Sequence, residues 1–256
     1  MKEYLLTAGP TPVPERVLLA MARPMLYHRA PAFTECLKET QENLKWLLQT
    51  KQLPLLLAGS GTVGMDAAVC NFLKTGDKAV VIRGGKFGER WGKICQAYGI
   101  ECVFIDVEWG KSVDPKAVAE AIEKNPGVRA VYATASETST ATKHDVEAVA
   151  KIVKGKDDVI LCVDAITAVG VFDVPMDKWG LDVVIVGSQK ALMLPPGLAV
   201  VAISDKAWKA NERSNLPRFY LDLMRERKSQ EKGETAFTPA VSLVVGLRES
   251  LRMLKE

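Results

Sequence analysis

LLLAGSGTVGMDAAVCNFLKTGDKAVVIR, residues 55–83, is the stretch that decides the fold. Its two apolar runs, Leu55–Ala58 and Ala79–Ile82, are rich in Leu, Val and Ile and too short for helices, so they predict buried strands. Between these runs, Val63–Leu73 has the length of a helix. A strand, a helix and a second strand in this order form the repeating unit of an α/β fold.

The same alternation continues along the chain. Helix-sized segments separate most of the later apolar runs, and one of them, Pro115–Lys124, opens with Asp114 as an N-cap and proline at the first helical position. We therefore predict an α/β fold with a mostly parallel central sheet of about seven strands, flanked by helices. The later strands are expected at Cys102–Ile105, Ala130–Thr134, Val159–Val163, Val183–Val186 and Leu198–Ile203, and the other helices at Glu89–Tyr98 and Val146–Lys154.

The two ends of the chain differ from this alternating region. Residues 1–14 are rich in proline around Gly9 and predict an extended arm, and residues 33–49 predict a helix. Residues 205–232 are strongly charged and predict solvent-facing helices. The segment Pro239–Glu256 has leucines at helical spacing and no glycine cap, so it predicts an amphipathic helix that is cut off at the last residue.

Composition places the chain among ordinary soluble proteins. Of 256 residues, 48% are hydrophobic and 25% are charged, which excludes a disordered or collagen-like chain. A net charge of +3 gives no argument for a nucleic-acid or membrane partner. The one long apolar stretch, Val183–Ile203, contains Lys190, two prolines and glycines, which a membrane span would not tolerate. We expect a soluble, cytoplasmic protein.

Cysteine and histidine usage argues against disulfides and metal sites. The 5 cysteines include no C-x-x-C pair and are expected to be small core residues in a reducing compartment. The 2 histidines, His28 and His144, are far apart and lack the pattern of a hydrolase triad or a zinc site. We expect His144 at the surface, ahead of a helix.

Two isolated charges mark the chemistry. Lys190 is the only charged residue between Val183 and Ile203, and Asp164 is the only one between Val159 and Phe172. Each follows a predicted buried strand, at the sheet edge where open α/β folds bind ligands. The two side chains could pair as a buried salt bridge, or they could address two ends of one cofactor. Desolvation lowers the pKa of a lysine and makes it a nucleophile able to form a Schiff base.

A third feature is the segment Gly59–Gly64, between the first strand and the first helix of the alternating region. Its small residues let the backbone approach an anion, the helix N-terminus supplies N–H donors, and Ser60 and Thr62 add hydroxyls. The same segment fits G-x-G-x-x-G, the dinucleotide fingerprint. The second strand ends at Arg83 rather than at an acid, which suits a phosphorylated ribose, so an NADP-dependent oxidoreductase is an alternative.

A phosphate cup, a buried aspartate and a buried lysine are the three anchors that pyridoxal phosphate (PLP) requires. With these residues the sequence resembles the class V, fold-type I PLP aminotransferases, within them the alanine–glyoxylate and serine–pyruvate group. The resemblance spans nearly the whole chain. It rests on LLTAGPTPVP (5–14), YHRAPAF (27–33), GSGT (59–62), GKFGER (85–90), SETSTAT (136–142), VDAITAVG (163–170), GSQKALMLPPG (187–197) and FTPAVS (237–242).

The resemblance implies roles for the cofactor-binding residues. Lys190 would bond the cofactor aldehyde and later move a proton, and Asp164 would hold the pyridine nitrogen protonated. Ser60, Gly61 and Thr62 would bind the phosphate. Gln189 would also contact the phosphate. Thr138 would bond the pyridine hydroxyl oxygen, and Phe87 would stack on the ring.

For Phe87 a plain core position is the alternative to stacking. Cysteine desulfurases resemble the same fold, but they stack a histidine on the ring and carry a catalytic cysteine on a later loop. No cysteine follows Cys162 in this chain, so an aminotransferase is preferred.

The resemblance also implies a homodimer with a shared active site. A loop of one subunit would complete the phosphate site of the other, and Thr235, or else Glu234 or Thr238, lies where that loop is expected. Gly9 would lie near the substrate carboxylate and His28 near the site entrance.

The implied domains are residues 1–29 as N-terminal arm and first helix, 30–238 as PLP-binding large domain, and 239–256 as the start of a helix leading to a C-terminal small domain. That small domain, which carries the arginine that clamps the substrate carboxylate in the family, is absent from this sequence.

The implied function is ping-pong transamination between a small amino acid, alanine or serine, and a small 2-oxo acid, glyoxylate or pyruvate. A PLP-binding module that is truncated and turns over no amino acid is a further alternative, beside the NADP-dependent oxidoreductase.

Overall fold

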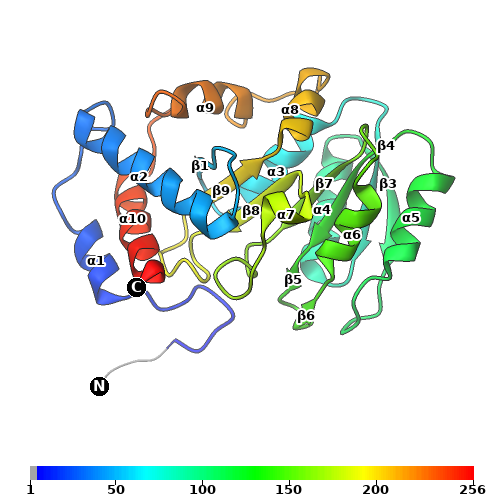
Figure 1. Cartoon of the computed structure of the whole chain (residues 1–256), viewed down its shortest axis with the longest axis horizontal. Helices are drawn as coiled ribbons and strands as arrows, with labels where there is room; N and C mark the ends of the chain where they lie inside the picture. The colour runs from blue at the N-terminus through cyan, green and yellow to red at the C-terminus, as the bar shows by residue number, and fades with distance from the viewer. Residues whose placement is uncertain (1–4) are drawn as a thin grey trace.

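Seven strands form the central sheet, and each coincides with one of the predicted apolar runs (Figure 1). The computed structural model describes residues 5–256. The strand order is β1-β9-β8-β7-β4-β2-β3, in which β9 alone runs opposite to the other six strands, so the predicted mostly parallel sheet is confirmed. The strands are β1 (Leu55–Ala58), β2 (Lys78–Arg83), β3 (Glu101–Asp106), β4 (Val128–Thr134), β7 (Ile160–Asp164), β8 (Val183–Gly187) and β9 (Leu198–Ile203).

Helices cover both faces of the sheet, because successive strand residues such as Val80 and Val81 point to opposite sides and each side is apolar. One face packs against α1 (Glu15–Met21), α2 (Pro31–Leu48), α5 (Pro115–Lys124), α6 (Val146–Val153), α7 (Met176–Trp179) and α10 (Val241–Lys255). The other packs against α3 (Gly61–Phe72), α4 (Lys86–Ala97), α8 (Asp205–Glu212) and α9 (Leu223–Gln230). The Asp114 carboxylate caps α5 as predicted, accepting the Lys116 N–H at 2.9 Å.

A small hairpin, β5 (Ser136–Glu137) with β6 (Thr142–Lys143), follows β4 and was not predicted from the sequence. Its strands are two residues long and polar, so they give no apolar period to detect. The hairpin lies beyond the carboxyl end of β4, beside the start of α4 (Figure 1). It therefore borders the edge of the sheet where ligands are expected.

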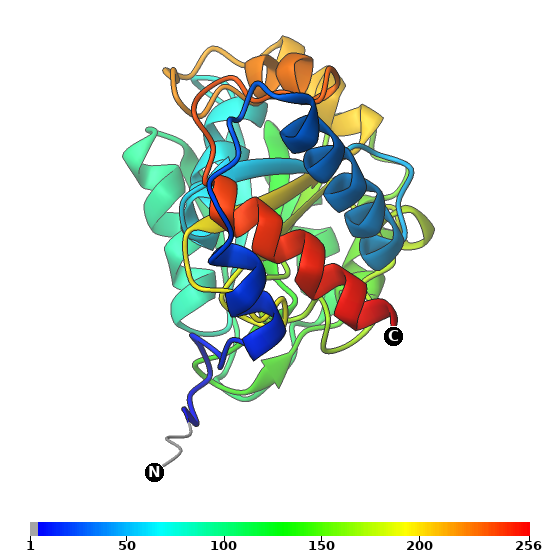
Figure 2. The same cartoon turned by 90° about the vertical axis from the view of Figure 1, so that its left-hand side faces the viewer.

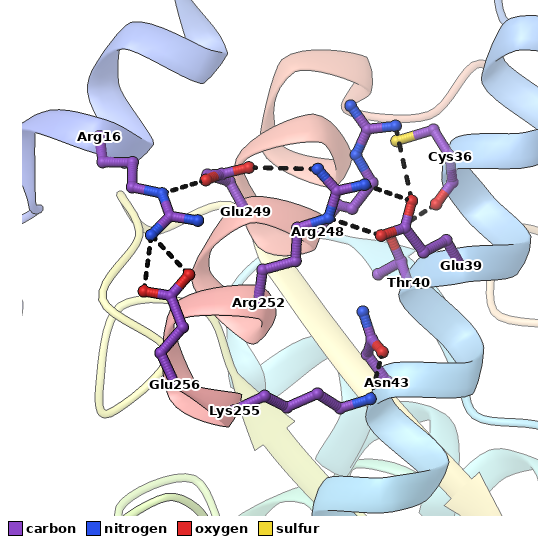
Figure 3. Close-up of polar contacts among 10 residues, drawn as sticks. All are labelled: Arg16, Cys36, Glu39, Thr40, Asn43, Arg248, Glu249, Arg252, Lys255 and Glu256. Atoms are coloured by element: carbon purple, nitrogen blue, oxygen red, sulfur yellow. Dashed lines mark hydrogen bonds and ion pairs between the residues drawn. The ribbon is translucent and has the colours of Figure 1, made fainter.

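Helix α10, at the C-terminal end, packs between α1 and α2. Helices α1, α2 and α10 lie side by side (Figure 2), and Leu247 and Leu251 of α10 are fully buried in the core cluster that covers this face of the sheet. Above this apolar contact the Arg252 guanidinium donates to both oxygens of Glu39 on α2, at 2.6 and 2.8 Å (Figure 3). Arg16 of α1 reaches Glu256 at 2.8 Å.

Two surface predictions need correction. The charged segment 205–232 does form helices, but Glu226 and Gln230 of α9 are buried, because Gln230 bonds the backbone of Leu56 on the edge strand β1. His144 is 2% exposed rather than on the surface. Its Nδ1 accepts the N–H of Val113, so the loop before α5 covers it, and burial lowers its pKa while the charge of Glu137 opposes that shift.

All 5 cysteines are free and all but Cys102 are buried, which agrees with small core residues. Within residues 5–256, every helix is too short or too polar to cross a membrane.

Candidate active site

The carboxyl ends of the strands surround a cavity of about 180 Å³. β7 ends at Asp164, β8 leads within three residues to Lys190, and β1 leads through a glycine-rich turn into α3. Because the strands are adjacent or nearly so, segments far apart in sequence converge there. Of the residues predicted for the site, eight line this cavity: Ser60, Gly61, Thr62, Phe87, Thr138, Asp164, Gln189 and Lys190.

Asp164 lines the cavity and is 3% exposed. Burial raises its pKa to about 6, although the Ile166 N–H, at 3.0 Å, and the charges of Arg90 and Lys190 favour the anion. Among the ion pairs formed within residues 5–256, none joins Asp164 to Lys190. The predicted alternative of a buried salt bridge is therefore not formed, and both groups are available to a ligand.

Lys190 is held by the N-terminal arm. Its Nζ donates to the carbonyl of Ala8 at 2.9 Å, and the Thr11 N–H and hydroxyl bond the carbonyls of Gln189 and Lys190. A side chain on Gly9 would collide with the Lys190 amine. Burial lowers the pKa of Lys190, while Asp164 opposes that shift, so the amine is easier to deprotonate than a surface lysine.

The start of α3 suits a phosphate. Ser60 occupies the N-cap without using its hydroxyl as a cap, and the first N–H groups of a helix have no partner within it. Gly61 has no room for a side chain, since one would meet Ile166. Nearby, Gln189 Oε1 is buried without a hydrogen-bond partner. An unpaired polar atom in the wall is what a ligand-binding cavity leaves when it is built for a further polar group.

Sequence reasoning missed four lining residues, Arg90, Ser136, Ile166 and Thr167. Arg90 donates to Thr62 Oγ1 at 3.1 Å and lies 4.8 Å from the centre of the Phe87 ring. The spacing of Phe87 and Arg90, three residues apart on one helix, was the signal that could have found it. Thr167 joins Thr138 through their hydroxyls at 3.2 Å.

Three predicted residues, Gly9, His28 and Thr235, are not among those that line the cavity, and of these Gly9 lies against the Lys190 side chain. Thr235 is buried in its own loop, where its hydroxyl donates to the Phe237 carbonyl at 2.7 Å, whereas Thr238 is exposed. His28 lies instead in an open groove formed with Tyr27 and the start of α10. The prediction that this region serves a partner subunit's site stays a prediction.

The sheet topology argues against the alternative of an NADP-dependent oxidoreductase. A dinucleotide fold places the second strand beside the first, so that its last residue reaches the ribose. Here four strands separate β1 from β2, and Arg83 at the end of β2 bonds both oxygens of Asp106 at 2.7 Å. A metal site is a separate question: within residues 5–256, no three His, Cys, Asp or Glu side chains lie close enough together to hold a metal ion.

A lysine amine, a buried carboxylate and a helix start suited to a phosphate, around one cavity, are the features of the large domain of a fold-type I PLP enzyme. Comparison with known proteins agrees. The aspartate aminotransferase of subgroup IV from Thermus thermophilus superposes with a TM-score of 0.91 at 34% identity, over 98% of this chain and 70% of that one.

The family model for class-V aminotransferases matches residues 3–256, so the chain belongs to that family. It is a PLP-dependent aminotransferase. Two curated relatives carry different names. The small subunit of a soluble hydrogenase from Synechococcus sp. (strain PCC 6716) is 45% identical over 99% of this chain and 67% of its own length. The serine–glyoxylate aminotransferase of Hyphomicrobium methylovorum is 35% identical over 98% of this chain and 64% of its own length. The chain thus spans about two thirds of these relatives.

Proposed function

We propose that the cavity around Lys190 binds PLP and transfers the amino group of alanine or serine to glyoxylate or pyruvate by a ping-pong mechanism. The observation that carries the proposal is the convergence of Lys190, Asp164 and the start of α3 on one cavity. The serine–glyoxylate aminotransferase among the relatives supports the choice of substrates.

Each residue has a defined task in this proposal. Ser60, Gly61 and Thr62 bind the phosphate through N–H and hydroxyl donors. Lys190 Nζ would hold the cofactor through its aldehyde carbon, and as a free amine it would take and return the substrate α-proton. Asp164 keeps the ring nitrogen protonated. When bound, PLP supplies the electron sink that makes the α-proton removable.

Further parts of the proposal come from the family resemblance alone. The protein acts in the cytoplasm as a homodimer, and the 234–238 loop of one subunit, through Thr235 or a neighbour, completes the phosphate site of the other. Gly9 and His28 face the substrate. Residues 1–29, 30–238 and 239–256 form the arm, the large domain and the start of a helix to a small domain.

The first test concerns the cofactor. The purified protein, incubated with PLP and freed of excess, should be yellow, and borohydride should fix the cofactor covalently to the peptide that contains Lys190. Lys190→Ala should stay colourless after desalting, while the exposed control Lys151→Ala behaves as wild type. A wild type that binds no PLP, or a label on another lysine, would overturn the proposal.

The second test concerns turnover. Alanine and serine, each added alone to the yellow protein, should convert the spectrum to that of the amine form, and glyoxylate or pyruvate should restore it. Aspartate is tested in parallel as a competing donor. Initial rates at several fixed acceptor concentrations should give parallel double-reciprocal lines. Conversion by aspartate only would replace the proposed donors, and a spectrum unchanged by every amino acid would indicate a binding module without turnover.

A further inference from the structure

Helix α4 carries Phe87 and Arg90 into the cavity, yet no residue of its own caps it. The N-cap position is Gly85, which offers no side chain. Helices leave their first N–H groups without internal partners, and buried N–H groups that stay unpaired destabilise a helix start. The donors of the first turn of α4 are instead taken up by the β5–β6 hairpin, a separate part of the chain.

Glu137 and Ser139 provide this cap. The Glu137 carboxylate accepts the N–H groups of Phe87, at 3.1 Å, and Gly88, at 3.0 Å, and also the Ser139 hydroxyl. Ser139 Oγ in turn accepts the Lys86 N–H at 2.9 Å. All three N–H groups at the start of α4 are therefore paired with two side chains of one short segment.

The fit is tight. Glu137 is 0% exposed. A Cβ placed on Gly85 would lie 2.6 Å from the carboxyl carbon of Glu137 and 2.5 Å from Ser139 Oγ. A Cβ on the preceding Gly84 would lie 2.6 Å from Nε2 of the buried His144. Glycine at position 85 thus leaves the space through which this carboxylate reaches the backbone of α4, and glycine at position 84 leaves space for His144.

The contacts of Glu137 and Ser139 connect two groups of cavity-lining residues. Thr138 lies between Glu137 and Ser139 on the hairpin and lines the cavity. Phe87 and Arg90, which also line it, lie on the first turns of α4, the helix that Glu137 and Ser139 cap. Glu137 itself is outside the set of residues that line the cavity. Its negative charge also lies at the positive end of the α4 dipole, which strengthens the contact.

We propose that Glu137 is a positioning residue of the PLP site, whose buried carboxylate sets the placement of Phe87 and Arg90 on α4 relative to Thr138 on the hairpin. This inference rests on the proposed function, because it takes the Lys190 cavity as the PLP site. It predicts that Glu137 affects how PLP is bound and oriented, and not only how stable the protein is.

The test compares Glu137→Gln with Asp182→Asn. Asp182 serves as the control: it is 4% exposed and accepts the Leu161 N–H at 2.9 Å and the Ser204 hydroxyl at 2.8 Å, directly before β8 at the amino ends of the strands, and it also pairs with Lys206 at 3.3 Å. PLP is titrated into each cofactor-free protein, the circular dichroism of the cofactor band is recorded at saturation, and urea unfolding is measured without PLP.

Glu137→Gln replaces one accepting oxygen by an NH₂ group that faces N–H donors. We expect PLP to bind about tenfold more weakly, as the loss of one charge-assisted hydrogen bond would give, and the dichroism of the bound cofactor to change. Asp182→Asn should lower the urea midpoint with the PLP dissociation constant and the dichroism unchanged.

Ser139→Ala is a milder second variant, in an exposed residue, which loses the Lys86 contact and should shift both PLP readouts in the same direction by less. Wild-type affinity and dichroism in both Glu137→Gln and Ser139→Ala would overturn the inference. So would equal losses of PLP affinity in Glu137→Gln and Asp182→Asn. A wild type that binds no PLP would instead overturn the proposed function.

Discussion

The Asp164 carboxyl illustrates the conflict between stability and chemistry at a single residue. It is buried, it has one backbone N–H as its hydrogen-bond partner, and no cation of residues 5–256 forms an ion pair with it. Such a carboxylate destabilises the protein without cofactor, because burial favours the protonated form. The protonated ring nitrogen of PLP would supply the missing positive partner.

We predict that Asp164→Asn stabilises the cofactor-free protein in a pH-dependent way. The pKa of Asp164 is about 6 when folded and 3.8 ordinarily, so between these values the folded state keeps a proton that the unfolded state has lost. Stability of the wild type therefore falls as pH rises through this window, by about 3 kcal/mol in total. Asparagine carries no such cost.

Urea unfolding at pH 4 and pH 7.5 checks this prediction. The free energy of unfolding of Asp164→Asn should be larger than that of the wild type at pH 7.5 and equal to it near pH 4. The variant should also lose transamination activity. A stability difference that is the same at both pH values would show that ionisation of Asp164 is not its source.

How far single residues could be predicted depended on how unusual they were locally. Asp164 and Lys190 were found because each is the only charge in a long apolar stretch. Arg90 stands among other polar residues on an amphipathic helix, so its place in the cavity needed the structure. His144 was misplaced because the loop before α5, far from it in sequence, is what buries it.

At the scale of elements, α10 is held by two kinds of contact with very different energies. Leu251 is 0% exposed in the core cluster, and the next residue, Arg252, is 45% exposed in its ion pair with Glu39. Exposed ion pairs contribute little, because solvent screens the charges and ordering the side chains costs entropy. The apolar face of α10 should therefore dominate its attachment.

Leu251→Ala should lower the free energy of unfolding by about 2–5 kcal/mol, and Arg252→Ala by about 0–1 kcal/mol. Urea unfolding of the two variants measures both, and repeating it at high salt should remove the small effect of Arg252→Ala. A larger loss from Arg252→Ala than from Leu251→Ala would mean that the network of Figure 3, and not the apolar face, holds the helix.

The elements themselves were predictable where they have a local signal. All seven sheet strands contain short apolar runs, and the helix Pro115–Lys124 is marked by its Asp114 cap and its first-position proline, so these were found. The β5–β6 hairpin was not found, because its residues are polar and its contacts are with the start of α4. Glu137 and Phe87, for example, are 50 residues apart in the sequence. A cap supplied from another element has no local sequence signal.

At the scale of the whole molecule, both ends of the described chain converge on the loop after β8. Ala8 and Thr11 bond the backbone or amine of residues 189 and 190, and Ser250 of α10 bonds the Leu192 carbonyl. The lysine is thus positioned by segments more than 200 residues apart. The position of the Lys190 amine therefore depends on contacts from both ends of the described chain, and not only on β8, the strand that leads to it.

Gly9→Ala tests this dependence. Gly9 has a φ of +132°, which disfavours any side chain, and a Cβ there would overlap the Lys190 amine and its last methylene carbons. Displacing the amine by about 1 Å should lower kcat by about 100-fold, because the reacting groups lose their alignment. Gly76→Ala is the matched control, since its φ is +89° and nothing lies within 4 Å of the added carbon. Both variants should lose some stability, measured by urea unfolding, but only Gly9→Ala should lose turnover and covalent capture of PLP at Lys190. Full activity in Gly9→Ala would mean that the arm merely covers the lysine and does not position it.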